Sequence, residues 1–281
     1  MTYLWINLSR IEPLVYQGVS IGVFHDHRVH RIRGNMLMTR LRTRWEPGDL
    51  YTKYVQRLVI GSPQLASYLL PLCRNLTSLA FMMNLTEDNK ARIHSLFTLS
   101  FPKLQRLWLK WSLLPPEQRS FHNPIFQNIT HLRIDYGQDI YWSGLSSLKN
   151  LTHLRLSFKG QRLENGRQLE VALHGIIYVV LPNLPPSLKY FTVPFRSHCA
   201  LYMAYESNNQ ICWDIEIGKY DPRLLLDWSA FLPPQIGNLL HEIRAVYDLL
   251  NSWTYLPRCC NDCWRRAELE IEYRNRIYNL M

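Results

Sequence analysis

Two stretches of the chain are close copies of each other, Asn128-Ile-Thr-His-Leu-Arg-Ile134 and Asn150-Leu-Thr-His-Leu-Arg-Leu156. Both contain the pattern L-x-x-L-x-L or an apolar variant of it, in which the last two apolar residues flank a polar one. Alternation of this kind places apolar side chains on one face of a short β-strand. The pair therefore predicts two short strands that bury the same face.

The same pattern recurs along most of the chain. Its copies begin at Val55, Leu76, Leu104, Ile129, Leu151 and Leu188, with a weaker copy at Cys212. The starts are 21, 28, 25, 22, 37 and 24 residues apart, and five of these spacings fall in the range of roughly 20–29 residues typical of leucine-rich repeats. One unit cannot bury its own apolar face, whereas stacked units bury a continuous core. We therefore expect an α/β leucine-rich-repeat-like solenoid with short parallel strands on its concave side.

The other segments give the expected domain organisation. Helical spacing of apolar residues predicts helices at 89–97 and 167–179, whereas prolines and asparagines predict irregular turns at 115–128. We expect three parts: an N-terminal cap at 1–50, irregular repeats at 51–220, and a helical C-terminal cap at 221–281. The predicted cap elements are a strand within 14–23, a basic helix at 35–44, and helices at 222–226, 234–253 and 261–279.

Composition places the chain among globular proteins with a basic charge. Hydrophobic residues make up 47% and charged residues 19%, and the net charge is +10. Basic residues are dense between Arg28 and Arg57, which favours acidic partners. Residues 1–21 do not resemble a signal peptide and no long apolar run occurs, so we expect a cytoplasmic or nuclear protein without a membrane span.

No motif predicts a catalytic, cofactor or metal site. Phosphate-binding glycine loops and nucleophile elbows are absent from the sequence, so we expect neither an enzyme nor a bound cofactor. The Cys260-x-x-Cys263 pair, beside Cys259, has no second pair for a structural zinc site, and its role stays open. His25 and His27 lack a companion motif, and a solvated loop is the simpler interpretation. The sequons at Asn75, Asn128 and Asn150 lie beside predicted strands, so we do not expect glycans there.

The side chains that alternate with the apolar residues form the expected binding face. One row holds Arg57, Ser78, Arg106, His131, His153, Tyr190 and Asp214, and the next holds Val59, Ala80, Trp108, Arg133, Arg155, Thr192 and Glu216. Each position could instead be a solvated strand residue. Cations mixed with an aromatic side chain are enriched in binding hot spots. The candidate partner-binding residues are therefore Arg57, Arg106, Trp108, Lys110, His131, Arg133, His153, Arg155 and Tyr190.

The charge along this face predicts the partner. If the strands stack in sequence order, about 4.8 Å apart, Arg106, Arg133 and Arg155 lie within roughly 10 Å of one another. Asp214 and Glu216 would then form an acidic edge. We expect a protein partner whose acidic or phosphorylated segment crosses the arginines, since such a segment relieves their repulsion.

Several segments resemble large fungal families of F-box proteins with divergent leucine-rich repeats. They are Arg10-Ile-Glu-Pro-Leu-Val-Tyr16, Leu72-Cys-Arg-Asn-Leu-Thr-Ser-Leu79, Leu181-Pro-Asn-Leu-Pro-Pro-Ser-Leu-Lys189 and Asp262-Cys-Trp-Arg-Arg-Ala-Glu268. The resemblance implies a repeat domain that recruits substrates to a cullin ubiquitin ligase. No Leu-Pro-x-Glu-type F-box helix precedes the first segment here, so the chain resembles the repeat portion alone.

Two function hypotheses follow. The first is a protein–protein interaction scaffold, in which the concave face binds a partner. The alternative is a nucleic-acid or anionic-surface binder that uses the basic region 28–57, although the sequence contains no recognised nucleic-acid-binding module.

Overall fold

The computed structural model describes residues 18–21, 52–53, 55–81, 83, 86–136, 139–158, 166–194 and 210–227, and also Trp264, Glu268, Leu269, Ile271 and Glu272. The chain divides into two compact units, Met1–His131 and Leu132–Met281. Helices and parallel strands occur in both units, so the chain is an α/β protein, as predicted.

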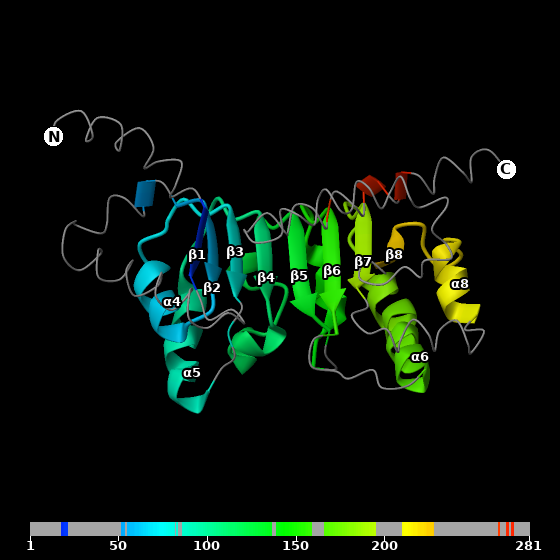
Figure 1. The fold of residues 1–281 in the computed structure, drawn as a ribbon, viewed down its shortest axis with the longest axis horizontal. Coiled ribbons are helices and arrows are strands. Elements are labelled where there is room, and N and C mark those ends of the chain that lie inside the picture. Colours follow the sequence, from blue (N-terminus) through cyan, green and yellow to red (C-terminus); the bar gives the residue numbers. More distant parts are fainter. Residues whose placement is uncertain are drawn as a thin grey trace, which may run out of the picture. The chain divides into compact units, whose positions relative to one another are not determined.

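The sheet of the first unit follows the order of the sequence. Its strands are β1 (Gly18–Ile21), β2 (Arg57–Ile60), β3 (Ser78–Phe81) and β4 (Arg106–Leu109), each parallel to the next (Figure 1). The register pairs Leu58 with Leu79 and Leu79 with Leu107. Equivalent positions of successive copies of the pattern therefore lie side by side. β1 lies inside the stretch 14–23, where a strand was predicted.

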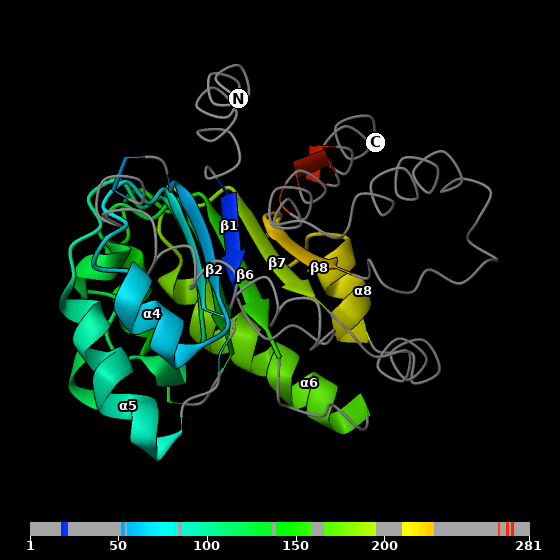
Figure 2. The same cartoon turned by 60° about the vertical axis from the view of Figure 1, so that its left-hand side comes forward.

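Two helices return the chain between these strands, α4 (Pro63–Leu69) and α5 (Glu87–His94), and α5 continues as the 3-10 helix η1 (Ser95–Thr98). Pro63 stands in the first turn of α4, where its fixed φ suits a helix and its missing N–H costs no hydrogen bond. Ala66 and Leu69 are fully buried. Figure 2 shows α4 next to β2, with α5 beside α4. The helix predicted at 89–97 is confirmed.

The segment between β4 and the next strand is irregular, as its prolines and asparagines predicted. Residues 110–130 are all described and contain the 3-10 helices η2 (Trp111–Leu113), η3 (Pro116–Gln118) and η4 (Pro124–Phe126), without an α-helix. The rings of Trp111, Phe121 and Phe126 have centroids 5.0, 5.6 and 6.2 Å apart. This aromatic cluster supplies the buried volume that a helix supplies elsewhere.

The second unit repeats the parallel arrangement. Its strands are β5 (His131–Asp135, from Leu132 on), β6 (His153–Ser157), β7 (Tyr190–Pro194) and β8 (Leu224–Asp227), in that order. The register pairs Leu154 with Phe191 and Phe191 with Leu224. Between β6 and β7 lies α6 (Gly166–Gly175), which continues as a π-helix, η6 (Ile176–Val180), and a 3-10 turn, η7 (Leu181–Asn183). The helix predicted at 167–179 is confirmed, with a wider last part.

The core consists of the pattern residues themselves. In the six copies that begin at Val55, Leu76, Leu104, Ile129, Leu151 and Leu188, all eighteen apolar residues are at most 3% exposed. Complete burial of a leucine-sized side chain contributes about 1.5–3 kcal/mol. The pattern therefore describes the packing in both units.

The sequons of the first unit have a structural role. The Asn75 side-chain amide donates to the carbonyl of Thr52 (2.5 Å), 23 residues earlier, and the Asn128 amide donates to that of Pro102 (3.1 Å), 26 residues earlier. The hydroxyls of Thr77 and Thr130 donate to the carbonyls of Gln56 and Gln105. These two Asn-x-Thr triplets thus hydrogen-bond their own segments to residues 21 to 26 positions earlier in the chain.

The seventh copy of the pattern was predicted wrongly. Cys212 and Ile215 are buried, but they lie on the helix α8 (Gln210–Glu216) and not on a strand. Gly218 ends this helix with a φ of 73°. Its N–H donates to the carbonyl of Ile215 and that of Lys219 to Asp214, both at 2.9 Å, which is a Schellman motif. The helix predicted at 222–226 is also wrong, because β8 occupies that stretch.

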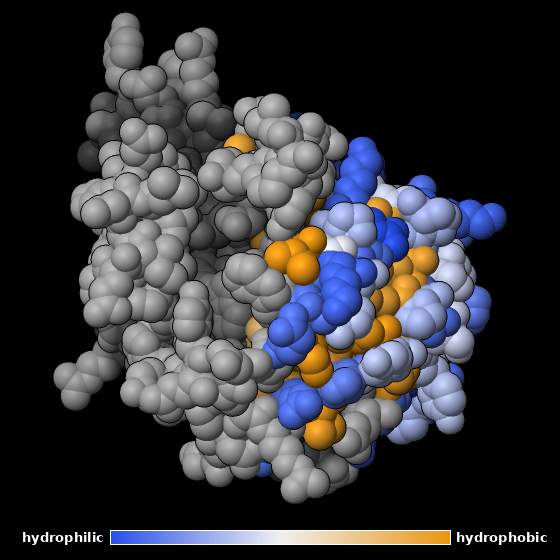
Figure 3. Space-filling model, turned by 90° about the vertical axis from the view of Figure 1, so that its right-hand side faces the viewer, coloured by the Kyte–Doolittle hydropathy of each residue, from blue (hydrophilic) through white to orange (hydrophobic). Residues whose placement is uncertain are grey.

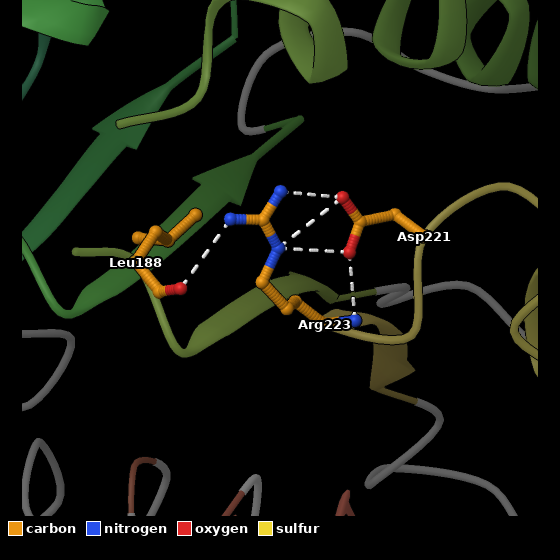
Figure 4. Close-up of polar contacts among 3 residues, drawn as sticks. All are labelled: Leu188, Asp221 and Arg223. Carbon is orange, nitrogen blue, oxygen red and sulfur yellow. Dashed lines mark hydrogen bonds and ion pairs between the residues drawn. The ribbon is translucent and has the colours of Figure 1, made fainter. Parts of the chain in front are cut away.

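An ion pair fixes the start of β8. The Arg223 guanidinium donates to both carboxylate oxygens of Asp221, with a shortest distance of 2.7 Å, and to the carbonyl of Leu188 at 3.4 Å (Figure 4). Asp221 in turn accepts the backbone N–H of Arg223 at 2.8 Å. Arg223 therefore links the turn before β8 to Leu188, which lies just before β7.

The remaining predicted features lie outside the described residues: the basic helix at 35–44, the helix at 234–253, and the His25 and Cys259–Cys263 groups. In the described part of the chain, no helix is long and apolar enough to cross a membrane.

Candidate functional site

The first row of predicted binding residues lies on the outward face of β2, β3 and β4. Because side chains alternate along a strand, burial of the pattern leucines turns the residues between them to the other face. The register places Arg57 beside Ser78 and Ser78 beside Arg106. At about 4.8 Å per strand, the two arginines lie roughly 10 Å apart. Arg57 is exposed, and Arg106 and Ser78 are partly exposed.

The second row adds apolar and aromatic surface beside the arginines. Val59 pairs with Ala80, and Ala80 pairs with Trp108. Val59 and the Trp108 indole are partly exposed, whereas Ala80 between them is only 5% exposed. Lys110 follows β4 with extended backbone, so alternation puts it on the same face as Arg106 and Trp108.

His131 ends the first unit and is held by its neighbour. Its Nδ1 lies 2.9 Å from the hydroxyl of Thr130, and that hydroxyl donates to the carbonyl of Gln105. Which of the two atoms donates in this pair depends on the tautomer of the imidazole. The contact orients the imidazole ring, which remains partly exposed.

The second unit presents its predicted residues differently. Arg133 on β5 is partly exposed, whereas His153 and Arg155 on β6 are only 7% and 6% exposed. The described residues of β6 are buried on both faces, unlike those of β2, β4 and β5. His153 and Arg155 are therefore buried, and their predicted role in partner binding stays a prediction.

The C-terminal segment covers this part of the sheet. Trp264 packs edge-on against the His153 ring, with centroids 5.3 Å apart, and Tyr190 stacks on the same ring at 4.6 Å. His153 Nε2 lies 3.2 Å from Glu268 Oε1. Ile271 packs with Leu225 of β8, and Tyr190 is packed against the two. Tyr190 is thus partly buried in a contact within the chain.

The predicted acidic edge does not form. Asp214 lies on α8, where its side chain is 5% exposed and accepts from Lys219 (2.6 Å) and Gln210 (2.7 Å). These hydrogen bonds lower the pKa of Asp214 below its usual value of 3.8. Glu216 is the last residue of the same helix. Arg155 pairs with Thr192, and Thr192 pairs with Leu225 of β8. The next residue in this row is therefore apolar, where an acidic residue was predicted.

The predicted proximity of Arg106, Arg133 and Arg155 stays a prediction. Arg106 belongs to the first unit, and Arg133 and Arg155 belong to the second. Within the second unit, β5 and β6 are neighbours, and the N–H of Tyr136 just after β5 donates to the carbonyl of Ser157 at 2.8 Å.

Metal binding and cysteine catalysis have little support among the described residues. They include no group of three or more His, Cys, Asp or Glu side chains placed to hold a metal ion. Burial raises the pKa of the Cys73 thiol to about 12, so this cysteine is a poor nucleophile.

At the end of the second unit that carries α8, hydrophobic and hydrophilic surface is interspersed (Figure 3).

Sequence reasoning missed the role of Glu268. The apolar residues of the predicted 261–279 helix, Trp264 and Ile271 among them, indicated a cap. The described residues there are helical, and positions 264, 268 and 271 are spaced i, i+4, i+7, which is one helix face. An acid between two large apolar residues on that face was the available signal for a contact with a basic or histidine side chain.

Comparisons with known proteins return no match, neither to a family model nor to a curated protein nor to a solved structure. The class of this protein is therefore defined by its own structure, an α/β chain with parallel strands.

Proposed function

We propose that this chain is a non-catalytic protein-binding module and that the outward face of β2–β4 binds an acidic or phosphorylated segment of a partner. One observation carries the proposal. The strand register puts Arg57 and Arg106 on either side of Ser78 in one row, with Trp108 in the next row.

The chemistry of this face suits a phosphate or carboxylate. Arginine binds such groups through two parallel hydrogen bonds, and Ser78 can donate a third from between the arginines. Trp108 beside Ala80 offers apolar contact area, and arginine and tryptophan dominate binding hot spots. The net charge of +10 would also speed the encounter with an acidic partner.

The finer fold that we propose is a leucine-rich-repeat-like solenoid. Its support is one parallel strand per copy of the pattern, burial of every pattern residue in six copies, and side-chain hydrogen bonds between successive coils. In such folds the strand side commonly binds partners. A role as the substrate-recognition part of an F-box-type ubiquitin ligase rests on resemblance alone, and co-purification of the cullin adaptor would test it.

The test is affinity capture with the full chain and charge-reversal variants. Arg106→Glu and Trp108→Ala should each reduce partner recovery at least tenfold. Arg92→Glu is the matched control, because Arg92 is exposed on α5, and it should leave recovery unchanged. Recovery that is equal in all three variants would contradict the proposal.

The alternative, a nucleic-acid or anionic-surface binder, uses the region 28–57, most of which lies outside the described residues. Salt dependence separates the two hypotheses, since binding to phosphate backbones weakens steeply as salt neutralises the polyanion. Retention of DNA or RNA that survives Arg106→Glu and disappears between low and physiological salt would favour the alternative.

A further inference from the structure

The same hydroxyl–imidazole pair occurs twice along the chain, once partly exposed and once buried. Thr130 and His131 form a hydroxyl–imidazole pair at 2.9 Å, and Thr152 and His153 form an equivalent pair at 2.8 Å. His131 is partly exposed, whereas His153 is 7% exposed. The difference comes from Trp264 and Glu268, which contact His153 directly.

The covering helix contacts the sheet as a ligand helix would. Trp264, Glu268 and Ile271 lie on one helix face, and each of them touches a residue of β6, β7 or β8. Leu269 and Glu272 are exposed. An amphipathic helix that docks through residues at i, i+4 and i+7 is a common mode of partner recognition.

The outward face of β6 and β7 contains polar side chains although it is buried. Buried polar side chains are concentrated here: of the six buried polar or charged residues in the described part of the chain, four lie on β6 and β7, namely His153, Arg155, Ser157 and Thr192. The Thr192 hydroxyl, between the buried Phe191 and Val193, has no hydrogen-bond partner among the described residues. A buried hydroxyl without a partner costs free energy, so this face is stabilised when it opens to water.

The contact of the C-terminal residues with the sheet also includes a polar pair, His153 and Glu268, in which another carboxylate could replace Glu268. The Glu268 side chain is 24% exposed, so water reaches its pair with His153. A carboxylate from another molecule can take the same place opposite His153. The aromatic contacts of His153, to Tyr190 and Trp264, require one large ring on the incoming helix.

We propose that the outward surface of β6–β8 is a binding site for an amphipathic helix, and that the chain's own C-terminal helix occupies it as a displaceable intramolecular ligand. The partner helix presents an aromatic, an acidic and an aliphatic residue at the spacing of Trp264, Glu268 and Ile271. The inference rests on the proposed function in one respect, that the outward face is the binding side.

The test uses a fluorescent peptide of residues 261–279 added to the full chain under reducing conditions. In wild type the site is occupied, so binding should be weak. In the double variant Trp264→Ala/Ile271→Ala the site is vacated, and the peptide should bind at least tenfold more tightly. Adding His153→Ala should remove that gain. Equal affinity for wild type and the double variant would overturn the proposal.

A second measurement uses wild type alone and so does not depend on how the variants fold. Amide hydrogen exchange reports the opening of each element. The amides of Glu268 and Ile271 should exchange at least 100-fold faster than those of Leu154 and Phe191. Equal rates would mean that the helix leaves only on global unfolding, which would overturn the proposal.

Arg106→Glu should not change peptide binding, so failure of the β2–β4 site is distinguishable from failure of this one.

Discussion

His153 Nε2 lies 3.2 Å from Glu268 Oε1, across 115 residues of sequence. The pair joins an inner strand of the sheet to the C-terminal helix. His153 is only 7% exposed where Glu268 and Trp264 contact it.

Glu268→Gln should lower the free energy of unfolding by less than about 1 kcal/mol, because the carboxylate is partly exposed and partly screened. Urea denaturation measures the change. Glu272→Gln is the matched control, since Glu272 is exposed on the same helix, and it should have no effect. A loss of several kcal/mol in Glu268→Gln would show that the helix is integral to the fold.

Leu107→Ala and Trp108→Ala should separate stability from binding. Leu107 is 2% exposed in the core, and its truncation should cost about 2–5 kcal/mol. Trp108 lies on the opposite face and is partly exposed, so its truncation should cost less stability and more binding. Thermal melts and affinity capture of both variants provide the comparison, and equal stability losses would contradict the assignment of faces.

The pattern predicted β2–β7 because three apolar residues per copy fix both the strand and its buried face. At Cys212 it was wrong: the three-residue spacing that all copies share fits a helix as well as a strand, and the spacing alone does not decide between them. Gly218 was the signal for the end of a helix. The apolar run Leu224–Leu226, buried on both faces, could not be distinguished from a helix by periodicity.

The sequence predicted which residues point outward from the strands, but not how exposed each of them is. Alternation identifies Arg106, Trp108 and His153 as outward, but it does not reveal what lies over them. The cover on His153 comes from residues more than one hundred positions later. Contacts over such separations depend on the three-dimensional path of the chain, which local patterns do not determine.

Gly175→Ala should destabilise the protein, although alanine normally stabilises a helix relative to glycine by about 0.5–1 kcal/mol. A Cβ at Gly175 would clash with the Tyr136 hydroxyl. The Tyr136 ring is held between Trp142 and Phe158, with centroids 5.9 and 5.4 Å away. We expect a loss of about 1–3 kcal/mol. Tyr136→Phe should relieve part of it, and a variant more stable than wild type would refute the packing.

Asp214→Asn should remove a pH dependence of stability at the acid end. The folded-state pKa of Asp214 is lowered from 3.8, chiefly by the hydrogen bond from Lys219 and then by that from Gln210. A lowered pKa stabilises the fold above the unfolded value and loses this effect as pH falls through the folded value. The difference in Tm between wild type and variant should be constant from about pH 7 to 5 and shrink below about 4. A difference in Tm that stays constant down to about pH 2 would contradict this role of Asp214.

The central claim is that a partner lies on the outward face of β2–β4, and site-specific photocrosslinking tests it most directly. A photoreactive amino acid would replace Ser78, between Arg57 and Arg106, or exposed Arg92 on α5 as the control. We predict a crosslinked partner from position 78, mapped to an acidic or phosphorylated segment, and none from position 92. Crosslinks from position 92 with none from position 78 would contradict the claim.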